Sequence, residues 1–142
     1  MTYHWPSNFW QQWLANAPVL CVDAVLVSKE KVLLSRRRTE PFKGYWHLPG
    51  GIVRKDETLE EALKRIVSIE IGLEDISIDK QIGIFDNPKR DPRGHFITVA
   101  FLISSNKLPK QINSQGEELK FFEKLPVKTG FDVDKITKEI FK

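Results

Sequence analysis

Glu70 is the residue of this sequence that most needs a chemical explanation. Residues 58–71 are predicted to form a helix, and on a wheel of about 100° per residue their aliphatic side chains share one broad face. Glu70 falls near the middle of that face. An ionised carboxylate there costs several kcal/mol unless a cation or hydrogen-bond donors meet it. We therefore interpret Glu70 as a metal ligand or active-site carboxylate, with a displaced salt bridge as the alternative. The aliphatic residues assigned to the face are Leu59, Ala62, Leu63, Ile66, Val67 and Ile69.

The turn before this helix suits an anionic ligand. Gly50 and Gly51 lack a Cβ, so a ligand can approach their backbone closely. The loop that follows leads to the start of the helix, where exposed amide groups and the helix dipole favour negative charge. Two adjacent glycines are common in turns, but their combination with Glu57, Arg65 and Glu70 is much more specific. Together these residues predict a site for an anion and a metal ion.

The elements that must position these residues follow from local patterns. Thr58 and Glu61 fit a capping box, and Gly72 stands where helices commonly end. Strands, a helix, more strands and a closing helix predict an α/β fold with a mixed β-sheet between helices. The predicted strands are 19–27, 31–35 (a hairpin with the first), 46–48, part of 76–85, 96–103 and 119–122, and the predicted helices are 5–14, 58–71 and 132–141.

Length and composition bound the class of protein. The 142 residues suit a single domain, with residues 1–17 as a helical extension and residues 18–142 as the core. Hydrophobic residues make up 41% and charged residues 29%, as in globular proteins. No apolar run approaches the ~18 residues of a membrane span. The start of the chain lacks a secretory pattern, and Cys21 lies alone in an apolar run, where we expect a buried thiol. We therefore expect a cytoplasmic protein without a membrane partner.

The predicted first helix is unusually aromatic. Trp5, Phe9, Trp10, Trp13 and Leu14 follow a helical spacing. So many apolar side chains on one short helix need a surface to cover, which is either the domain's own sheet or a second subunit. Because aromatic residues are enriched at interfaces, we predict a homodimer.

The spacing around the double glycine resembles that of the Nudix family. The family pattern is a glycine, five residues, a glutamate, seven residues, and then Arg-Glu-U-x-Glu-Glu-x-Gly-U, where U is aliphatic. Gly51, Glu57, Arg65, Glu70 and Gly72 occupy the matching positions. The resemblance covers roughly residues 19–122. It implies an α/β/α sandwich and a hydrolase of nucleoside diphosphate derivatives that uses Mg²⁺, with Mn²⁺ as an alternative ion.

Two positions depart from the family pattern. Ile66 and Ile69 stand where the family has glutamates that bind metal or act as a base. Isoleucine cannot bind Mg²⁺, which requires hard oxygen ligands. The helix can therefore hold at most one ion. The departure also supports a second hypothesis of a different class, a Nudix-fold binding or regulatory module with little turnover.

One branch, the GDP-mannose mannosyl hydrolases, also keeps only the last glutamate. The resemblance to this branch implies one Mg²⁺ held by Glu70, a main-chain carbonyl at Gly51 and Gln115, with water attacking the sugar carbon. The branch has a histidine base where this chain has Gly116. Residues 91–95 instead resemble ADP-ribose pyrophosphatases, so both kinds of substrate stay open. The segments that resemble the mannosyl hydrolases are residues 41–46, 55–60 and 65–73.

The general base and the positive partners are the remaining site residues. Glu117 and Glu118, just after Gln115, are the first candidates for the base. His95 is a second candidate, here also assigned to the substrate site, and His47 faces either the cleft or the core.

Arginines supply the predicted positive partners. Arg37, within the run 36–38, is assigned to phosphate, because Arg matches phosphate oxygens bidentately. Arg65 is assigned to catalysis or to holding Glu57, itself a predicted metal ligand. We expect a small-molecule nucleoside diphosphate derivative, most of all a nucleotide sugar. An RNA-directed role rests only on a pI near 9.0 and this run, so no nucleic-acid partner is expected.

Overall fold

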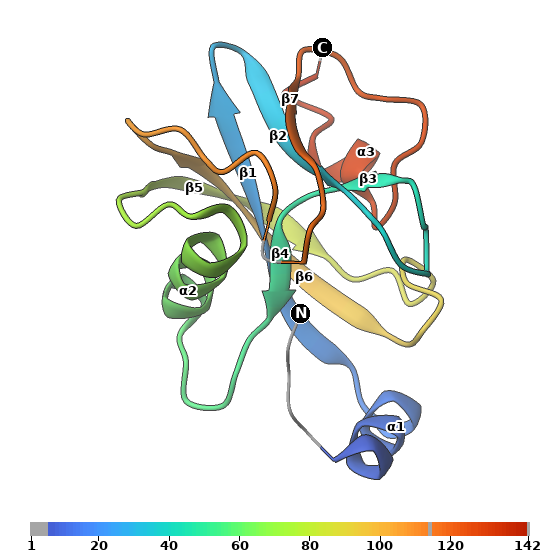
Figure 1. Cartoon of the computed structure of the whole chain (residues 1–142). Helices are drawn as coiled ribbons and strands as arrows, with labels where there is room; N and C mark the ends of the chain where they lie inside the picture. The colour runs from blue at the N-terminus through green and yellow to red at the C-terminus, as the bar shows by residue number, and fades with distance from the viewer. Residues whose placement is uncertain (1–5, 114, 142) are drawn as a thin grey trace.

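A mixed β-sheet with helices on both faces forms the centre of the computed structural model, which describes residues 6–113 and 115–141 (Figure 1). The strands are ordered β3-β2-β1-β6-β5, with β4 also paired to β1 and β7 to β2. Strands β1 and β6 run parallel, and the other paired strands run antiparallel. The strands are β1 (Val19–Ser28), β2 (Lys31–Arg36), β3 (Trp46–His47), β4 (Gly50–Ile52), β5 (Ser77–Phe85), β6 (Phe96–Ser104) and β7 (Leu119–Phe122).

Two hydrophobic clusters form because side chains alternate across the central strand. Val22, Ala24 and Leu26 of β1 point to α2 (Leu59–Ile71), whereas Val25 points to the face that carries α3 (Val133–Ile136). This arrangement confirms the predicted α/β/α sandwich with a mixed sheet. Among the described residues, no helix combines the length and apolar character that crossing a membrane requires.

The helix α2 begins and ends where the sequence predicts. The Thr58 hydroxyl accepts a hydrogen bond from the Glu61 N–H at 3.1 Å, and the Glu61 carboxylate accepts one from the Thr58 N–H at 3.2 Å. Gly72 closes the helix in the left-handed region with φ of 75°. The prediction for Ile69 is wrong, because its side chain is 49% exposed at the edge of the apolar stripe.

The predicted final helix over residues 132–141 is also wrong in length, because α3 has only four residues. The Thr137 N–H still makes a helical bond to the Val133 carbonyl at 3.0 Å, but beyond it the Ile140 N–H donates only three residues back, to Thr137 at 2.9 Å, as in a turn. Turns follow as far as residue 140. Val133 and Ile136 are buried as predicted, and Ile140 packs partly buried against the same cluster.

The first helix, α1 (Ser7–Asn16), lies at one end of the sheet (Figure 1). Trp10 and Leu14 pack against a small cluster that includes Cys21, whose thiol is buried as expected. Phe9 and Trp13 are 44% and 37% exposed. The part of the predicted helix at residue 5 lies outside the described residues.

Strands β1 and β2 separate at the double-glycine turn, where the chain passes from pairing with β2 to pairing with β1. Residues 46–47 pair with β2, with His47 opposite Ser35, whereas β4 pairs with β1, with Gly50 opposite Asp23. Gly50, predicted to lie in a turn, is therefore the first residue of a strand. The sequence did not indicate this strand, because it is short and begins with two glycines. The chain crosses from one neighbour to the other at residues 48–49, and this crossing places the turn at the point where the two strands separate.

Candidate active site

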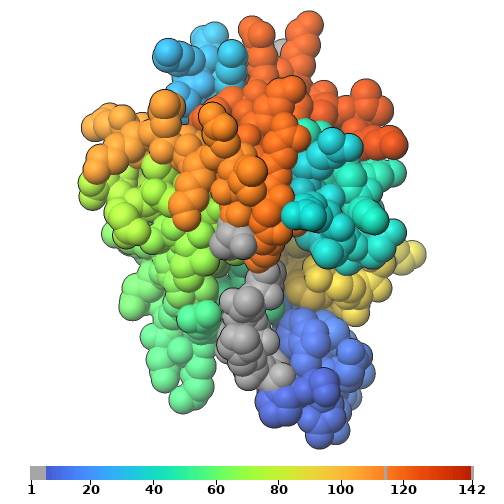
Figure 2. All heavy atoms as spheres, in the orientation of Figure 1, coloured from blue at the N-terminus to red at the C-terminus, as the bar shows by residue number. Residues whose placement is uncertain are grey.

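A cleft of about 270 Å³ opens beside the double-glycine turn. On the face seen in Figure 2 the segment before β7 (orange) lies between α2 (green) and residues 36–45 (cyan), and residues from all three segments line the cleft. Polar and charged side chains supply most of the lining, which suits a polar ligand. They include Ser35, Arg37, His47, Glu70, Arg93, Asn113, Gln115 and Glu117.

The predicted metal residues Glu70 and Gln115 meet in this cleft. The Gln115 side-chain amide donates a hydrogen bond to the Glu70 carboxylate at 3.3 Å. Asn113 fixes the loop, because its side-chain oxygen accepts from the Gln115 backbone N–H at 2.9 Å. Gly50 lines the same cleft, so the structure brings the turn, the end of α2 and the loop before β7 together.

Glu57 and Arg65 form a pair of their own. Arg65 donates to both Glu57 oxygens, at 2.6 and 2.9 Å, and the Arg54 N–H donates to one of them at 2.8 Å. The side-chain hydrogen bonds from Arg65 lower the pKa of Glu57. Arg65 also donates to the Ile52 carbonyl at 2.9 Å. Glu57 is not among the described residues that line the cleft, so this pair ties β4 to α2 instead of joining Glu70.

Glu117 lies buried in the cleft, whereas Glu118 does not. Ser35, His47 and Asn113 side chains approach the same Glu117 oxygen at 2.8, 3.1 and 3.2 Å. Burial raises the pKa of Glu117, but hydrogen bonds from His47 and Ser35 outweigh it and lower the value to about 2. Such a carboxylate is a weak proton acceptor near neutral pH. Glu118 is exposed and lines a separate depression beside the arginine run.

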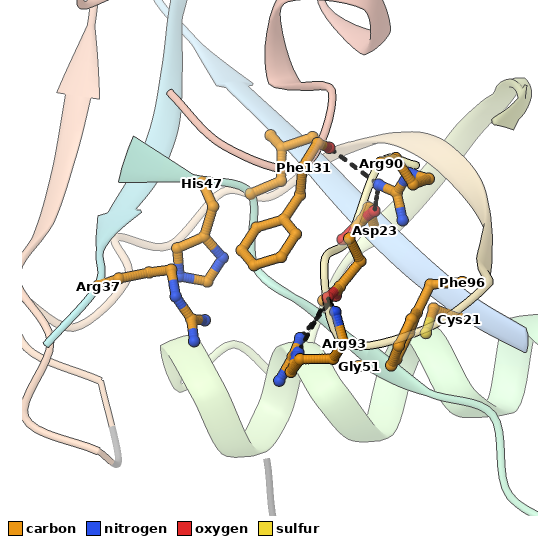
Figure 3. Close-up of a pocket in the computed structure, with 12 residues that line it drawn as sticks. Cys21, Asp23, Arg37, His47, Gly51, Arg90, Arg93, Phe96 and Phe131 are labelled. Atoms are coloured by element: carbon orange, nitrogen blue, oxygen red, sulfur yellow. Dashed lines mark hydrogen bonds and ion pairs between the residues drawn. The ribbon is translucent and has the colours of Figure 1, made fainter. Parts of the chain in front are cut away.

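A second cavity, of about 80 Å³, adjoins the cleft and shares its arginines. Arg37, His47, Arg93 and Phe131 surround it (Figure 3). The guanidinium groups of Arg37 and Arg93 lie 5.1 and 5.7 Å from the centre of the Phe131 ring. Burial, followed by the charge of Arg93, lowers the pKa of Arg37. The Arg93 guanidinium donates to both oxygens of the Asp91 carboxylate, at 3.0 and 2.7 Å, and this ion pair holds it at the cavity.

A buried ion-pair network positions the Phe131 ring. Arg90 donates to the Phe131 carbonyl at 2.9 Å and to the Asp132 carboxylate at 3.3 Å. Its guanidinium also lies 3.8 Å from Asp23, whose carboxylate accepts from the Thr98 hydroxyl at 2.7 Å. Phe131 and Asp132 both have left-handed backbones, with φ of 58° and 62°, a conformation that these residues rarely adopt. Arg90 therefore holds a strained segment against the sheet.

Asp23 also explains why the turn needs glycine. A Cβ at Gly50 would lie 2.0 Å from the Asp23 carboxylate oxygen, which no side chain can tolerate. Burial raises the pKa of Asp23, against the charge of Arg90 and the Thr98 hydrogen bond. The turn, the carboxylate and the arginine are thus one packed unit beneath the cavity.

A comparison with known families decides the identity of this fold and cleft. The NUDIX domain model matches residues 17–139. The chain belongs to the Nudix family.

Relatives of known name agree with this assignment. An ADP-ribose pyrophosphatase of Methanocaldococcus jannaschii is 37% identical over 124 residues, which cover 86% of this chain and 72% of that protein. The low-salt glycan biosynthesis protein Agl8 of Haloferax volcanii is 35% identical over 124 residues, covering 83% and 79%. The Nudix domain of NrtR from Shewanella oneidensis, solved with ADP ribose, has a TM-score of 0.67 at 29% identity, covering 90% of this chain and 96% of that one.

The two isoleucines that depart from the Nudix pattern occupy different surroundings. Ile66 is buried directly beneath the turn, where a Cβ on Gly51 would lie 3.0 Å from its side chain. Ile69 is exposed on the outer edge of α2. The space under this Nudix turn is therefore apolar at Ile66, and Glu70 is the Nudix carboxylate of α2 that reaches the cleft.

The structure does not bring His95 into the Nudix site. His95 directly precedes β6, and its Nε2 atom lies 3.2 Å from the carbonyl of Asp86, just after β5. His95 is not among the described residues that line either cavity. Sequence reasoning missed Asp23, Arg90, Arg93 and Phe131. A charged residue in the apolar strand 19–27 could have revealed Asp23, and the stretch that resembles ADP-ribose pyrophosphatases contains Arg93.

Proposed function

We propose that this Nudix protein is a Mg²⁺-dependent hydrolase of a nucleoside diphosphate linked to another moiety, either GDP-mannose-like or ADP-ribose-like. The observation that carries the proposal is the meeting of Glu70 and Gln115 beside the Gly50 turn, next to the cavity where Arg37 and Arg93 converge. This juxtaposition offers oxygen ligands for a cation and guanidinium groups for a diphosphate. The relatives named for ADP-ribose and for glycan biosynthesis support both kinds of substrate.

The donor set fits a hard divalent ion. The Glu70 carboxylate, the Gln115 amide oxygen and the Gly51 carbonyl would hold it, with water at the remaining positions, as Mg²⁺ prefers. A half-turn of the Gln115 amide would present its oxygen in place of the NH₂ group that now faces Glu70. When bound, the ion would offset the negative charge of a departing nucleoside diphosphate. Mn²⁺ is the alternative ion.

The protein's own residues bind and orient the substrate in this account. Arg37 and Arg93 bind the phosphate groups, and Gly50 and Gly51 let the backbone approach them closely. The Arg65–Glu57 pair fixes the turn to α2, so we propose a supporting role for Glu57 in place of direct ligation. Ile66 packs against the turn and offers no oxygen atom, so Glu70 is the proposed carboxylate ligand from α2.

A binding or regulatory module with little turnover is the alternative function. Ile66 and Ile69 favour it, because they remove two carboxylates of the Nudix pattern. The related NrtR domain holds ADP ribose, which shows that binding of such a ligand is within reach of the fold. The two functions differ in whether a bound ligand is cleaved.

A substrate panel separates the two functions. GDP-mannose, ADP-ribose, dinucleoside polyphosphates and 8-oxo-dGTP would be incubated with the protein in Mg²⁺ and in EDTA, and products and binding would be measured in parallel. Mg²⁺-dependent cleavage of a nucleotide sugar supports the hydrolase. Binding of ADP-ribose without cleavage supports the module, and neither binding nor cleavage of any of these compounds contradicts both.

We also propose a cytoplasmic homodimer, with α1 at the interface. Phe9 and Trp13 are partly exposed on α1 and lie close together, with ring centroids 6.2 Å apart, while Trp10 and Leu14 attach the helix to the core. Aromatic side chains of this kind are enriched at interfaces. A cytoplasmic location is consistent with Cys21 remaining a free thiol.

Removal of the helix is expected to abolish the dimer. Sedimentation of the full chain should give a dimer, and deletion of residues 1–14 should give a monomer or aggregate, because Trp10 and Leu14 also cover the core. The paired substitution of Phe9 and Trp13 by serine is the gentler variant, which should give a folded monomer. A full chain that sediments as a clean monomer at high concentration would show that α1 serves its own domain alone.

A further inference from the structure

His47 lies at the boundary between the two cavities. It lines both the cleft that contains Glu70 and the smaller cavity that contains Arg37 and Arg93. Pairing of β3 with β2 places it opposite Ser35, and its ring packs edge-on to Phe131 with centroids 5.9 Å apart. The side chain is 18% exposed, so it is held in place and still open to a ligand.

Glu117 fixes the orientation of this ring. The His47 Nε2 atom lies 3.1 Å from a carboxylate oxygen that also accepts from Ser35 and Asn113. The Glu117 backbone N–H is held in turn by the Asn113 side-chain oxygen at 2.8 Å. Each group around the carboxylate is therefore tied to β2, β3 or the loop before β7.

This contact determines which ring nitrogen carries the proton. A carboxylate only accepts hydrogen bonds, so the His47 Nε2 atom must be the donor. In the neutral ring Nδ1 is then left as a hydrogen-bond acceptor. Within residues 6–113 and 115–141, no hydrogen bond to His47 Nδ1 is present, so this atom is available to a water molecule in the cavities.

We propose that His47 is the catalytic residue that accepts the proton of the attacking water, with Glu117 as its positioning residue. The inference rests on the proposed hydrolase function and names a base for it. Glu117 is less suited to that task itself, because three donors already share one of its oxygens. The arrangement of an acceptor nitrogen whose opposite nitrogen faces a buried carboxylate is a common way to orient a base.

The proposed step balances within the groups named. The water oxygen forms a bond to the electrophilic atom of the substrate, and the bond from that atom to the leaving oxygen breaks. Its electron pair departs with the nucleoside diphosphate. One water proton moves to His47 Nδ1, and the imidazolium that forms is stabilised by the Glu117 carboxylate until it loses the proton to solvent.

Substitution of His47 by alanine, with added imidazole, tests the role in turnover. The variant should lose about 10²–10⁴-fold in kcat, the usual contribution of a general base. Its affinity for Mn²⁺ by calorimetry should stay within about twofold, because His47 is not in the proposed ligand set. Free imidazole should raise the kcat of the variant at least about tenfold. Imidazole should change the kcat of neither the unaltered protein nor the Glu70→Gln variant, because a free base does not replace the metal ligand that this variant lacks.

Nitrogen-15 NMR of labelled histidine provides a readout that does not depend on turnover. The neutral His47 ring should be the tautomer protonated at Nε2, and Glu117→Gln should change the balance between the two tautomers. A ring protonated at Nδ1, or a His47→Ala variant that keeps kcat within about threefold or is not restored by imidazole, would overturn the inference. If the unaltered protein cleaves no compound, the proposed function fails and the base assignment fails with it; an active protein with an unaffected His47→Ala variant overturns the base alone.

Discussion

Replacement of Glu70 by glutamine is expected to weaken Mg²⁺ or Mn²⁺ binding at least about tenfold, or by about 1.4 kcal/mol. Glutamine keeps the size of the side chain but removes the negative charge of Glu70, the residue of the Nudix pattern on α2 whose carboxylate lines the cleft. It also keeps a hydrogen-bonding group for Gln115, so the local packing should survive. Isothermal titration calorimetry with Mn²⁺ measures the change directly.

Glu60→Gln is the matched control. Glu60 lies on the same helix, is exposed, and pairs with Lys64 one turn away at 3.0 Å. It is not a proposed metal ligand. Its substitution removes the same charge and should leave the affinity unchanged. Equal affinities for the Glu70 variant and the unaltered protein would show that Glu70 is a structural residue of α2.

Replacement of Arg90 by leucine is expected to destabilise the fold by about 3–5 kcal/mol, the usual effect of removing one member of a buried ion pair. Arg90 is buried between the Asp23 and Asp132 carboxylates, at 3.8 and 3.3 Å. Its loss leaves the Asp23 carboxylate without this guanidinium, leaves Asp132 to the exposed Lys135 at 3.8 Å, and releases the strained Phe131 backbone. Urea unfolding followed by circular dichroism gives the free energy of unfolding for both proteins.

A second substitution distinguishes lost charge balance from lost packing. Asp132→Asn in the Arg90→Leu background removes one of the stranded carboxylates, so it should recover part of the lost stability. The same Asp132→Asn change alone should destabilise the protein. A loss below about 1 kcal/mol for Arg90→Leu would show that the network does not hold the Phe131 segment in place.

Sequence patterns predicted the helices and strands that are determined by residues close to one another in the chain. The helix that ends at Gly72 and the strands at residues 19–28 and 96–104 follow from periodicity and caps, which a short stretch of sequence contains in full. The strand Gly50–Ile52 exists because β1 pairs with it, so its own residues gave no indication. The last helix is shorter than predicted because turn-like bonds between residues three apart replace helical ones after Thr137, a change that apolar spacing does not reveal.

Part of the cleft was predictable from the sequence, because the motif spacing indicated Glu70 and the segments outside the motif indicated Arg37 and Gln115, which also line it. Glu57, Arg65 and Glu70 stand at fixed spacings, yet the structure ties Glu57 to Arg65 and leaves Glu70 in the cleft. Arg93 and Phe131 come from distant loops, and tertiary packing alone brings them together. The contact between His47 and Glu117 spans 70 residues and follows from strand pairing, so sequence reasoning left His47 between cleft and core.

The position of bond cleavage depends on how many ions the site can hold. Two-metal sites stabilise both the entering and the leaving oxygen during attack at phosphorus. Because Ile66 and Ile69 replace two glutamates of the Nudix pattern, we propose that α2 supplies Glu70 alone, to a single ion. One ion suffices to stabilise a departing nucleoside diphosphate while water attacks a sugar carbon. We therefore expect free sugar and intact nucleoside diphosphate from a nucleotide sugar.

Hydrolysis in ¹⁸O-water, with Mg²⁺ present and the products weighed by mass spectrometry, tests this account of a single-ion hydrolase most directly. Label is expected in the released sugar and not in the nucleoside diphosphate, and no labelled product is expected after EDTA. Label in a phosphate product would contradict it, because a second ion, completed by Glu57, Glu117 or Glu118, would then support attack at phosphorus. Absence of label from every product in Mg²⁺ would contradict the proposed hydrolysis itself.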